Sequence, residues 1–228
     1  MDPNHNPNHT PTEPDATRAA WERHYGRSKS RQTYPDENLV RLLAPLERGP
    51  ALDLGCGSGR HLKLLEELGF GPLYGCDSSE NSLAISREVC PTAQLFHVSA
   101  ARETFRLPLP DASVRVLVCW GVLHYNSTDS AIAMLHEIVR VLTTDGVFLG
   151  TLRAEGDSHF HTNPDMAGAE IELFDEGGAR NFLGSHFASV DLGYALRSPV
   201  GELNRRVCHW IFRARDARST TNAERQSS

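Results

Sequence analysis

The stretch Ala51-Leu52-Asp53-Leu54-Gly55-Cys56-Gly57-Ser58-Gly59 decides the fold of this 228-residue chain. Its first four residues form a short apolar strand, and helical spacing of apolar residues begins after the glycines, over His61 to Leu68. Glycines at alternate positions remove the Cβ atoms where a backbone turns sharply and approaches a ligand. The spacing is GxGxG, with Arg60 where the dinucleotide pattern GxGxxG has its third glycine. The stretch therefore predicts a ligand-binding strand–turn–helix unit and counts against NAD or FAD.

Strands and helices alternate through the rest of the chain. We expect further strands at 72–76, 94–98, 114–119 and 147–152, and helices at 79–89 and 130–142. The run Val114 to Cys119 is nearly continuously apolar, interrupted by Arg115 alone, which is typical of a parallel strand buried on both faces. After residue 153 the pattern predicts a helix over 175–183 and two strands, 187–195 and 205–214. The expected fold is α/β: a mainly parallel seven-stranded sheet with an antiparallel edge hairpin and helices on both faces.

The two ends of the chain differ in composition from the middle. Residues 1–17 are rich in Pro, Asn, His and Thr, and residues 216–228 are also polar, so we expect two disordered tails around a single domain over 18–215. Within this domain, 18–48 is expected to form N-terminal cap helices: a short one at Trp21 to Tyr25 and an amphipathic one over 36–47, interrupted by Pro45.

Charge and hydropathy exclude several classes of protein. The chain has 23 Lys and Arg against 29 Asp and Glu, a net charge of −6, and no basic block, so nucleic-acid binding is not expected. No apolar run approaches the ~20 residues of a membrane helix. The amino end lacks a basic and then apolar signal segment, which predicts a cytoplasmic protein.

The five cysteines, at positions 56, 76, 90, 119 and 208, contain no CxxC pair. Structural zinc sites use paired ligands at short spacing, so we expect buried free thiols in a reducing compartment, with disulfides or a metal as the alternatives. The eleven histidines contain no HExxH pattern, and their single HxxxH pair, His5 and His9, lies in the polar N-terminal stretch, so no metal site is predicted.

The glycine loop resembles that of the class I S-adenosylmethionine-dependent methyltransferases, whose motif (D/E)xGxGxG matches residues 53–59 position by position. The resemblance extends over roughly residues 20–214 and implies a Rossmann-like class I methyltransferase fold. It also implies S-adenosyl-L-methionine as cofactor and S-adenosyl-L-homocysteine as product. In the family the loop backbone wraps the methionine part of the cofactor, which assigns this role to Asp53, Gly55, Cys56, Gly57 and Gly59.

The second match is Gly75-Cys76-Asp77-Ser78-Ser79, at the end of the second strand. The resemblance implies that Asp77, with Ser78 beside it, accepts the ribose hydroxyls of the cofactor. The alternative is that Asp77 caps the helix that follows, a role that Ser78 or Ser79 would serve equally well.

The third strand departs from the family pattern, because Val98-Ser99-Ala100-Ala101 lacks the Asp that many members place beside adenine. Ser99 and Ala100 are therefore the candidates for this contact, through the Ser99 hydroxyl or through backbone. Farther on, 107–111 and 135–142 resemble a turn and a helix of the family, and we assign them no chemistry.

In the family the turn after the fourth strand borders the reactive methyl group, so Cys119 and Trp120 are candidate cofactor contacts; Trp120 is equally well a core aromatic. His124 is a candidate general base, with a packing residue as the alternative. His159 and His161 are further candidates, in an expected acceptor-side insertion over 154–185, unless they belong to a solvated loop. Tyr25 or Tyr34 is expected to close over the methionine end.

The resemblance implies transfer of a methyl group, by in-line displacement, to O, N, S or C of a small molecule, with a specialised metabolite as one candidate acceptor. We expect a monomer or homodimer that acts away from membranes. The alternatives are an RNA or protein methyltransferase, a protein that binds the cofactor without turnover, or a nicotinamide oxidoreductase. The nucleic-acid N-methyltransferase motif (D/N/S)PPY does not occur.

Overall fold

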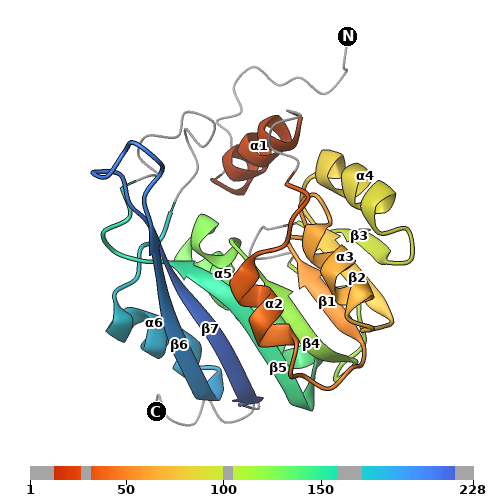
Figure 1. Cartoon of the computed structure of the whole chain (residues 1–228). Helices are drawn as coiled ribbons and strands as arrows, with labels where there is room; N and C mark the ends of the chain where they lie inside the picture. The colour runs from red at the N-terminus through yellow and green to blue at the C-terminus, as the bar shows by residue number, and fades with distance from the viewer. Residues whose placement is uncertain (1–12, 27–31, 100–104, 159–170, 219–228) are drawn as a thin grey trace.

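Seven strands form one sheet in the order β3-β2-β1-β4-β5-β7-β6 (Figure 1). The computed structural model describes residues 13–26, 32–99, 105–158 and 171–218. The strands are β1 (Ala51–Leu54), β2 (Leu73–Asp77), β3 (Gln94–His97), β4 (Val114–Cys119), β5 (Leu142–Arg153), β6 (Phe187–Arg197) and β7 (Val207–Ala217). The helices are α1 (Glu13–Tyr25), α2 (Glu37–Leu43), α3 (Arg60–Glu67), α4 (Glu80–Val89), α5 (Thr128–Val141) and α6 (Glu176–Gly184), with a short 3₁₀ helix η3 (Leu123–Tyr125).

The sheet is parallel from β3 to β5, and β7 runs antiparallel to both of its neighbours, β5 and β6. This confirms the expected mainly parallel sheet with an antiparallel hairpin at its edge. The chain reverses its direction of travel across the sheet between β1 and β4. In open α/β sheets a crevice forms at this point, beyond the carboxyl ends of the strands.

The sheet separates two apolar cores, because successive side chains of a strand point to opposite faces. In β4, Leu117 and Cys119 belong to the core that α5 and α6 cover, whereas Val116 and Val118 belong to the core that α2, α3 and α4 cover. Helices therefore lie on both faces of the sheet, as the alternating pattern predicts. The two cores hold the strands in place, and so position the strand ends at which a ligand can bind.

Some boundaries differ from the sequence expectation. Helix α1 begins at Glu13, inside the stretch 1–17 that we expected to be a disordered tail, and β7 continues to Ala217, two residues beyond the expected end of the domain. Helix α2 ends at Leu43 rather than near residue 47, since Pro45 lacks the N–H that would continue the helix.

All five cysteines are buried and unpaired, which confirms the free thiols expected from their spacing. Within the described residues, no helix is both long enough and apolar enough to span a membrane.

Candidate active site

A cavity of about 600 Å³ lies at the carboxyl ends of β1, β2, β4 and β5, with residues of α1 in its lining. Figure 1 shows α1 above these strand ends. One side is formed by the glycine loop after β1 and by the end of β2. The opposite side is formed by η3 and by the β5, β7 and β6 strands. The cavity thus occupies the switch point of the sheet, where ligands of open α/β folds bind.

The glycine loop adopts a backbone that other residues would not tolerate. Gly55 has a φ of +74° and Gly57 a φ of +55°, and a Cβ on Gly57 would lie 2.2 Å from the Tyr25 hydroxyl. A Cβ on Gly55 would lie 2.2 Å from the Val122 side chain. The glycines therefore allow both the turn and the close approach of neighbouring groups to the backbone.

Asp77 is buried and tied to the glycine loop. One carboxylate oxygen accepts a hydrogen bond from the Gly57 N–H at 2.8 Å, and the other accepts from the Ser79 N–H at 2.9 Å. Burial raises the pKa of Asp77, and these backbone donors oppose the rise. The helix cap is Ser79, whose Oγ accepts from the Ser82 N–H, so capping does not account for the Asp77 carboxylate.

Asp53 is fully buried directly before the loop, and within the described residues neither of its carboxylate oxygens has a hydrogen-bond partner. Burial raises the pKa of Asp53 to about 7. A buried carboxyl group without a partner is rare in native proteins and calls for an explanation. Here it lies beside a glycine loop and a second carboxylate at the end of β2. As hydrogen-bond acceptors, the two carboxyl groups fit the positively charged, hydroxyl-bearing S-adenosylmethionine, with Asp77 at the cavity lining and Asp53 behind it.

The cavity is apolar beyond Asp77, where the buried side chains of Val98 and Phe105 line it. Ser99 is exposed and does not line the cavity, so its side chain is not in position for the contact expected of it. Ala100 lies outside the described residues. Apolar contacts therefore dominate this part of the cavity, and no carboxylate is placed there among the described residues.

His124 lies on the opposite side and is completely buried. Its Nδ1 lies 3.3 Å from the Thr151 carbonyl oxygen, so the Nδ1–H donates and Nε2 carries the free electron pair. Within the described residues Nε2 has no hydrogen-bond partner, and it is shielded from solvent. Burial and the nearby His209 and Arg153 hold the pKa of His124 well below its usual range, so the ring is neutral.

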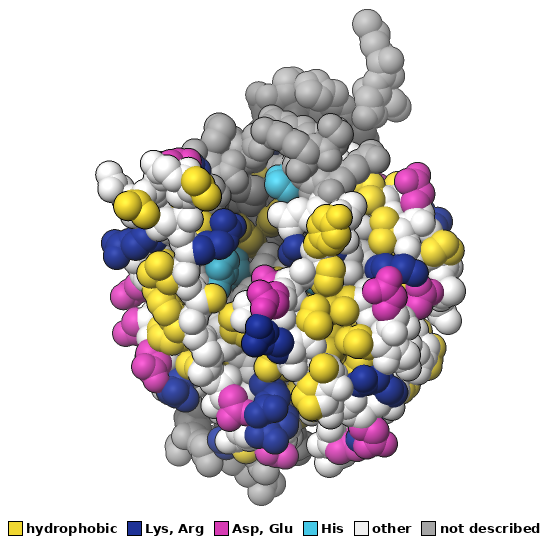
Figure 2. All heavy atoms as spheres, in the orientation of Figure 1, with side chains coloured by type: hydrophobic (Ala, Val, Ile, Leu, Met, Phe, Trp, Pro, Cys, Tyr) yellow, Lys and Arg dark blue, Asp and Glu magenta, His cyan; other side chains and the backbone are white. Residues whose placement is uncertain are grey.

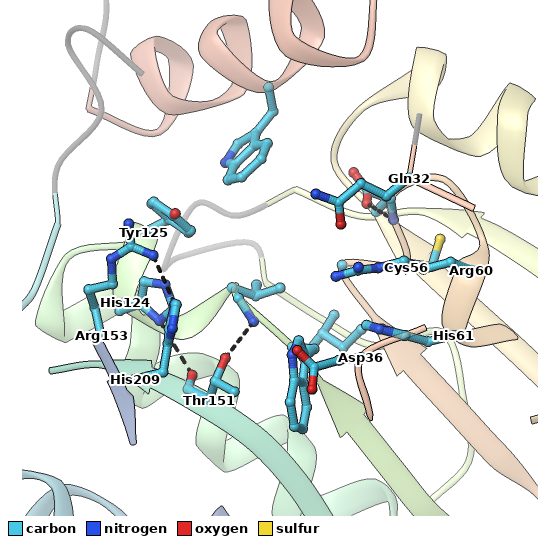
Figure 3. A pocket seen from close by; sticks show the side chains of 18 of the residues that line it. Gln32, Asp36, Cys56, Arg60, His61, His124, Tyr125, Thr151, Arg153 and His209 are labelled. Atoms are coloured by element: carbon cyan, nitrogen blue, oxygen red, sulfur yellow. Dashed lines mark hydrogen bonds between the residues drawn. The ribbon is translucent and has the colours of Figure 1, made fainter. Parts of the chain in front are cut away.

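Arg153 and His209 form a cross-strand pair beside His124 (Figure 3). Arg153 Nη1 donates to His209 Nε2 at 2.8 Å, and Arg153 Nε lies 3.2 Å from the Asp157 carboxylate. Burial, and next the Arg153 charge, lower the pKa of His209 to about 4. This end of the cavity therefore combines a buried guanidinium with two neutral imidazoles.

The structure brings most of the predicted site residues into one cavity. Those that line it are Tyr25, Gly55, Cys56, Gly57, Asp77, Ser78, Trp120 and His124. Asp53, Gly59 and Cys119 lie behind this lining, and Tyr34 is 83% exposed, so of the two tyrosines only Tyr25 lies over the loop. His159 and His161 lie outside the described residues.

Arg153 and His209 were not identified from the sequence. Arg153 directly follows the strand predicted at 147–152, which is a usable signal because ligands bind at the carboxyl ends of parallel strands. His209 lies on an antiparallel edge strand, and only the register that pairs it with Arg153 places it in the cavity. In the part of the chain that the structure describes, no group of three His, Cys, Asp or Glu is arranged to hold a metal ion.

Comparison with known proteins finds methyltransferases among the proteins that this chain resembles. Residues 51–146 match the model of a methyltransferase domain. A human mitochondrial arginine-hydroxylase is 32% identical over 148 residues, which cover 64% of this chain and 40% of that protein. The trans-aconitate 2-methyltransferase of Sinorhizobium fredii is 40% identical over 65 residues, 28% of this chain and 25% of that protein. The chain thus spans less than half the length of these curated relatives.

A solved complex of the Haloferax volcanii Trm112 methyltransferase activator with a methyltransferase contains a chain of the same fold. The TM-score is 0.67 at 18% identity, over 91% of this chain and 99% of that one. This likeness concerns the fold alone. The match of residues 51–146 and the fold of the described chain support its resemblance to the class I S-adenosylmethionine-dependent methyltransferases, whose cofactor is S-adenosylmethionine.

Proposed function

We propose that this chain transfers the methyl group of S-adenosylmethionine to a small-molecule acceptor by in-line displacement. The observation that carries the proposal is a single cavity with two chemically different ends. The glycine loop and Asp77 form one end, and His124, Arg153 and His209 form the other. Figure 3 shows His124, Arg153 and His209 on one side of the cavity and Cys56, Arg60 and His61 on the other.

The residues at the first end would hold the cofactor. Asp77 has acceptor capacity for ribose hydroxyls, since a carboxylate oxygen can accept more than one hydrogen bond beside those from the Gly57 and Ser79 N–H groups. The loop backbone from Gly55 to Gly57 approaches the cavity without Cβ atoms, and Tyr25 packs over it from α1. When bound, S-adenosylmethionine supplies a methyl group on a positively charged sulfur.

The main contribution of the protein is to hold the acceptor in line and close, which is the largest source of acceleration for a displacement of this kind. Helix α1 supplies Trp21, His24 and Tyr25 to the cavity and so limits the access of water. Trp120 lines the cavity between the two ends, where an aromatic face is suited to a cation.

His124 is the proposed proton acceptor for acceptors that must lose a proton. It is neutral and carries a free electron pair on Nε2, as this role requires. Its depressed pKa makes it a weak base, and its enclosed Nε2 restricts contact to a group placed against the ring. These properties favour acceptors whose attacking atom ionises readily or is already an anion.

The size of the cavity favours a small acceptor. Ligand cavities usually measure about 300–1,000 Å³, and the 600 Å³ cavity of this chain must accommodate both the cofactor and the acceptor. A relative named for trans-aconitate supports the same class of acceptor. Five buried unpaired thiols support a reducing, cytoplasmic setting.

The test supplies the purified full chain with S-adenosylmethionine labelled in its methyl group, and with three separate fractions: small metabolites, total RNA and protein. We expect label in the metabolite fraction, lost in Asp77→Ala and retained in the matched surface variant Asp191→Ala. Label in RNA or protein alone contradicts the small-molecule assignment. Binding of the cofactor with no label in any fraction identifies a non-catalytic member of the fold and contradicts turnover.

A further inference from the structure

The acceptor end of the cavity carries a group of basic side chains to which the methyl-transfer proposal gives no chemical role. Arg153, His209 and Arg197 all line it, from the neighbouring strands β5, β7 and β6. In the space-filling view, Lys or Arg and His side chains lie together beside a hollow of the surface, next to the β6–β7 hairpin (Figure 2).

The strand register explains why these side chains share a face. Arg153 pairs with His209, and His209 pairs in turn with Ala195, so the three lie side by side across the sheet. Arg197 follows Ala195 by two positions, which puts it on the same face because side chains alternate along a strand. The antiparallel hairpin at the sheet edge thereby brings two guanidinium groups to one cavity.

Arg153 is buried yet has a donor to spare. The residue is only 6% exposed, and its Nη1 donates a hydrogen bond to His209. Its Nε lies within ion-pair distance of Asp157 but does not form a hydrogen bond with it. Within the described ranges, this buried Nε therefore has no hydrogen-bond partner. A buried guanidinium normally uses its fork of donors on a carboxylate or phosphate, so the unused donor points to an anionic ligand.

The carboxylate nearest to this end pairs with Arg153 and leaves Arg197 without an ion pair in the described structure. Asp157 faces Arg153 and also accepts the Cys208 N–H at 2.8 Å, so it neutralises one guanidinium at most. Arg197 is exposed and, over the residues that the structure describes, takes part in no ion pair. His124 and His209 are neutral, and Asp36 lines the cavity from the side of α2.

We propose that the acceptor is a small carboxylic acid whose carboxylate binds to Arg153 and Arg197. The proposal rests on the methyl-transfer function above, because it assigns the substrate class of that cavity. It also accounts for the weak base at His124, since a carboxylate reaches the cavity already ionised at neutral pH. The planar fork of Arg153 matches a carboxylate geometrically, and Arg197 adds a second charge.

The experiment uses the full chain loaded with S-adenosylhomocysteine, with saturation of that complex measured first. Two probe pairs that differ in charge, benzoate with benzamide and succinate with succinamide, are then titrated while the histidine ring signals are followed by NMR. We expect at least one carboxylate to bind saturably and its amide to bind at least tenfold more weakly. A bound carboxylate should raise the pKa of His209 from about 4, whereas that of His186, outside the cavity, should not change.

Arg197→Gln is the main variant, because an exposed side chain without an ion pair can be replaced without unfolding the protein. It should weaken binding of the carboxylate about tenfold and leave the affinity for S-adenosylhomocysteine unchanged. Arg153→Lys keeps the positive charge near Asp157, but it should weaken binding of the carboxylate because the planar fork of guanidinium donors is lost. Arg213→Gln, on β7 but outside the cavity and paired with Asp191, is the matched control.

The two proposals fail in different ways. If S-adenosylhomocysteine binds but neither carboxylate is preferred over its amide, or if Arg197→Gln and Arg213→Gln bind carboxylate alike, the carboxylate proposal is wrong and the methyl-transfer proposal stands. If S-adenosylhomocysteine does not bind, the methyl-transfer proposal fails first.

Discussion

Asp53 and Asp77 are two buried carboxyl groups at neighbouring strand ends, and they differ in their hydrogen-bond partners and in their pKa. Asp77 accepts two backbone hydrogen bonds, which stabilise its charged form against burial. Asp53 has no such partner in the described structure, and its pKa rises to about 7. The sequence motif predicts both positions but not this difference, because hydrogen-bond geometry decides it.

The variant Asp77→Ala should lower the affinity for S-adenosylhomocysteine at least tenfold, since charge-assisted hydrogen bonds contribute about 1.5–3 kcal/mol to binding. Isothermal calorimetry measures this loss directly. Asp191→Ala, which removes an exposed carboxylate on β6, is the control for a change of charge alone. Equal affinities for wild type and Asp77→Ala would remove Asp77 from the cofactor site.

The variant Asp53→Asn should change how stability depends on pH. Because the pKa of Asp53 is raised on folding, from 3.8 to about 7, its protonation stabilises the folded state. This contribution is complete below about pH 4 and is lost as the pH rises to about 7. The free energy of unfolding of Asp53→Asn relative to wild type should therefore increase over this range, by roughly 2–4 kcal/mol, and stay constant above it. Urea unfolding at several pH values measures the difference, and a constant difference contradicts the assignment.

At the scale of elements, α1 is held over the cavity by few contacts. The Glu22 carboxylate accepts hydrogen bonds from the Glu80 N–H at 2.7 Å and the Asn81 side chain at 2.6 Å, both at the start of α4. An acidic group at a helix N-terminus is stabilised by the orphan N–H groups there. Tyr25 contacts the glycine loop at Gly57.

The variant Glu22→Ala should loosen α1 while the sheet stays folded. We expect faster amide hydrogen exchange in 13–26 and a several-fold weaker affinity for S-adenosylhomocysteine, because Trp21, His24 and Tyr25 line the cavity. Glu37→Ala on α2, which removes an exposed ion pair with Arg41, is the control. Unchanged exchange in α1 together with unchanged affinity would show that this contact does not hold the helix.

The elements also show where sequence reasoning succeeds. Apolar periodicity predicts the parallel strands, and β4 has the bounds expected from its nearly continuous apolar run. The glycine spacing predicts which end of the sheet carries the site. The register of β5, β7 and β6, which places Arg153 beside His209, depends on long-range pairing and has no local signal.

At the scale of the whole molecule, two buried histidines and one partly buried histidine, all neutral, should make the fold sensitive to acid. Burial lowers the pKa of His61 to about 3 and that of His209 to about 4, and it holds the pKa of His124 well below its usual range.

 The unfolded chain therefore binds protons that the folded chain excludes, and the free energy of unfolding should fall as the pH drops from about 6.5 to about 4. Protonation of Asp53 opposes this loss, but it is one group against three.

Thermal unfolding midpoints over this pH range measure the effect. His61→Gln, which removes the charging of one buried ring, should reduce the loss of stability on acidification. A midpoint that stays constant or rises between about pH 6.5 and pH 4.5 would contradict the burial of neutral histidines.

The central claim is that the cavity at the switch point of the sheet is built for S-adenosylmethionine. The most direct measurement is a calorimetric titration of the full chain with S-adenosylhomocysteine and, separately, with NAD. We predict a one-to-one complex with S-adenosylhomocysteine at a dissociation constant below about 1 mM, and no heat of binding with NAD. Absence of S-adenosylhomocysteine binding, or binding of NAD in its place, would contradict the account.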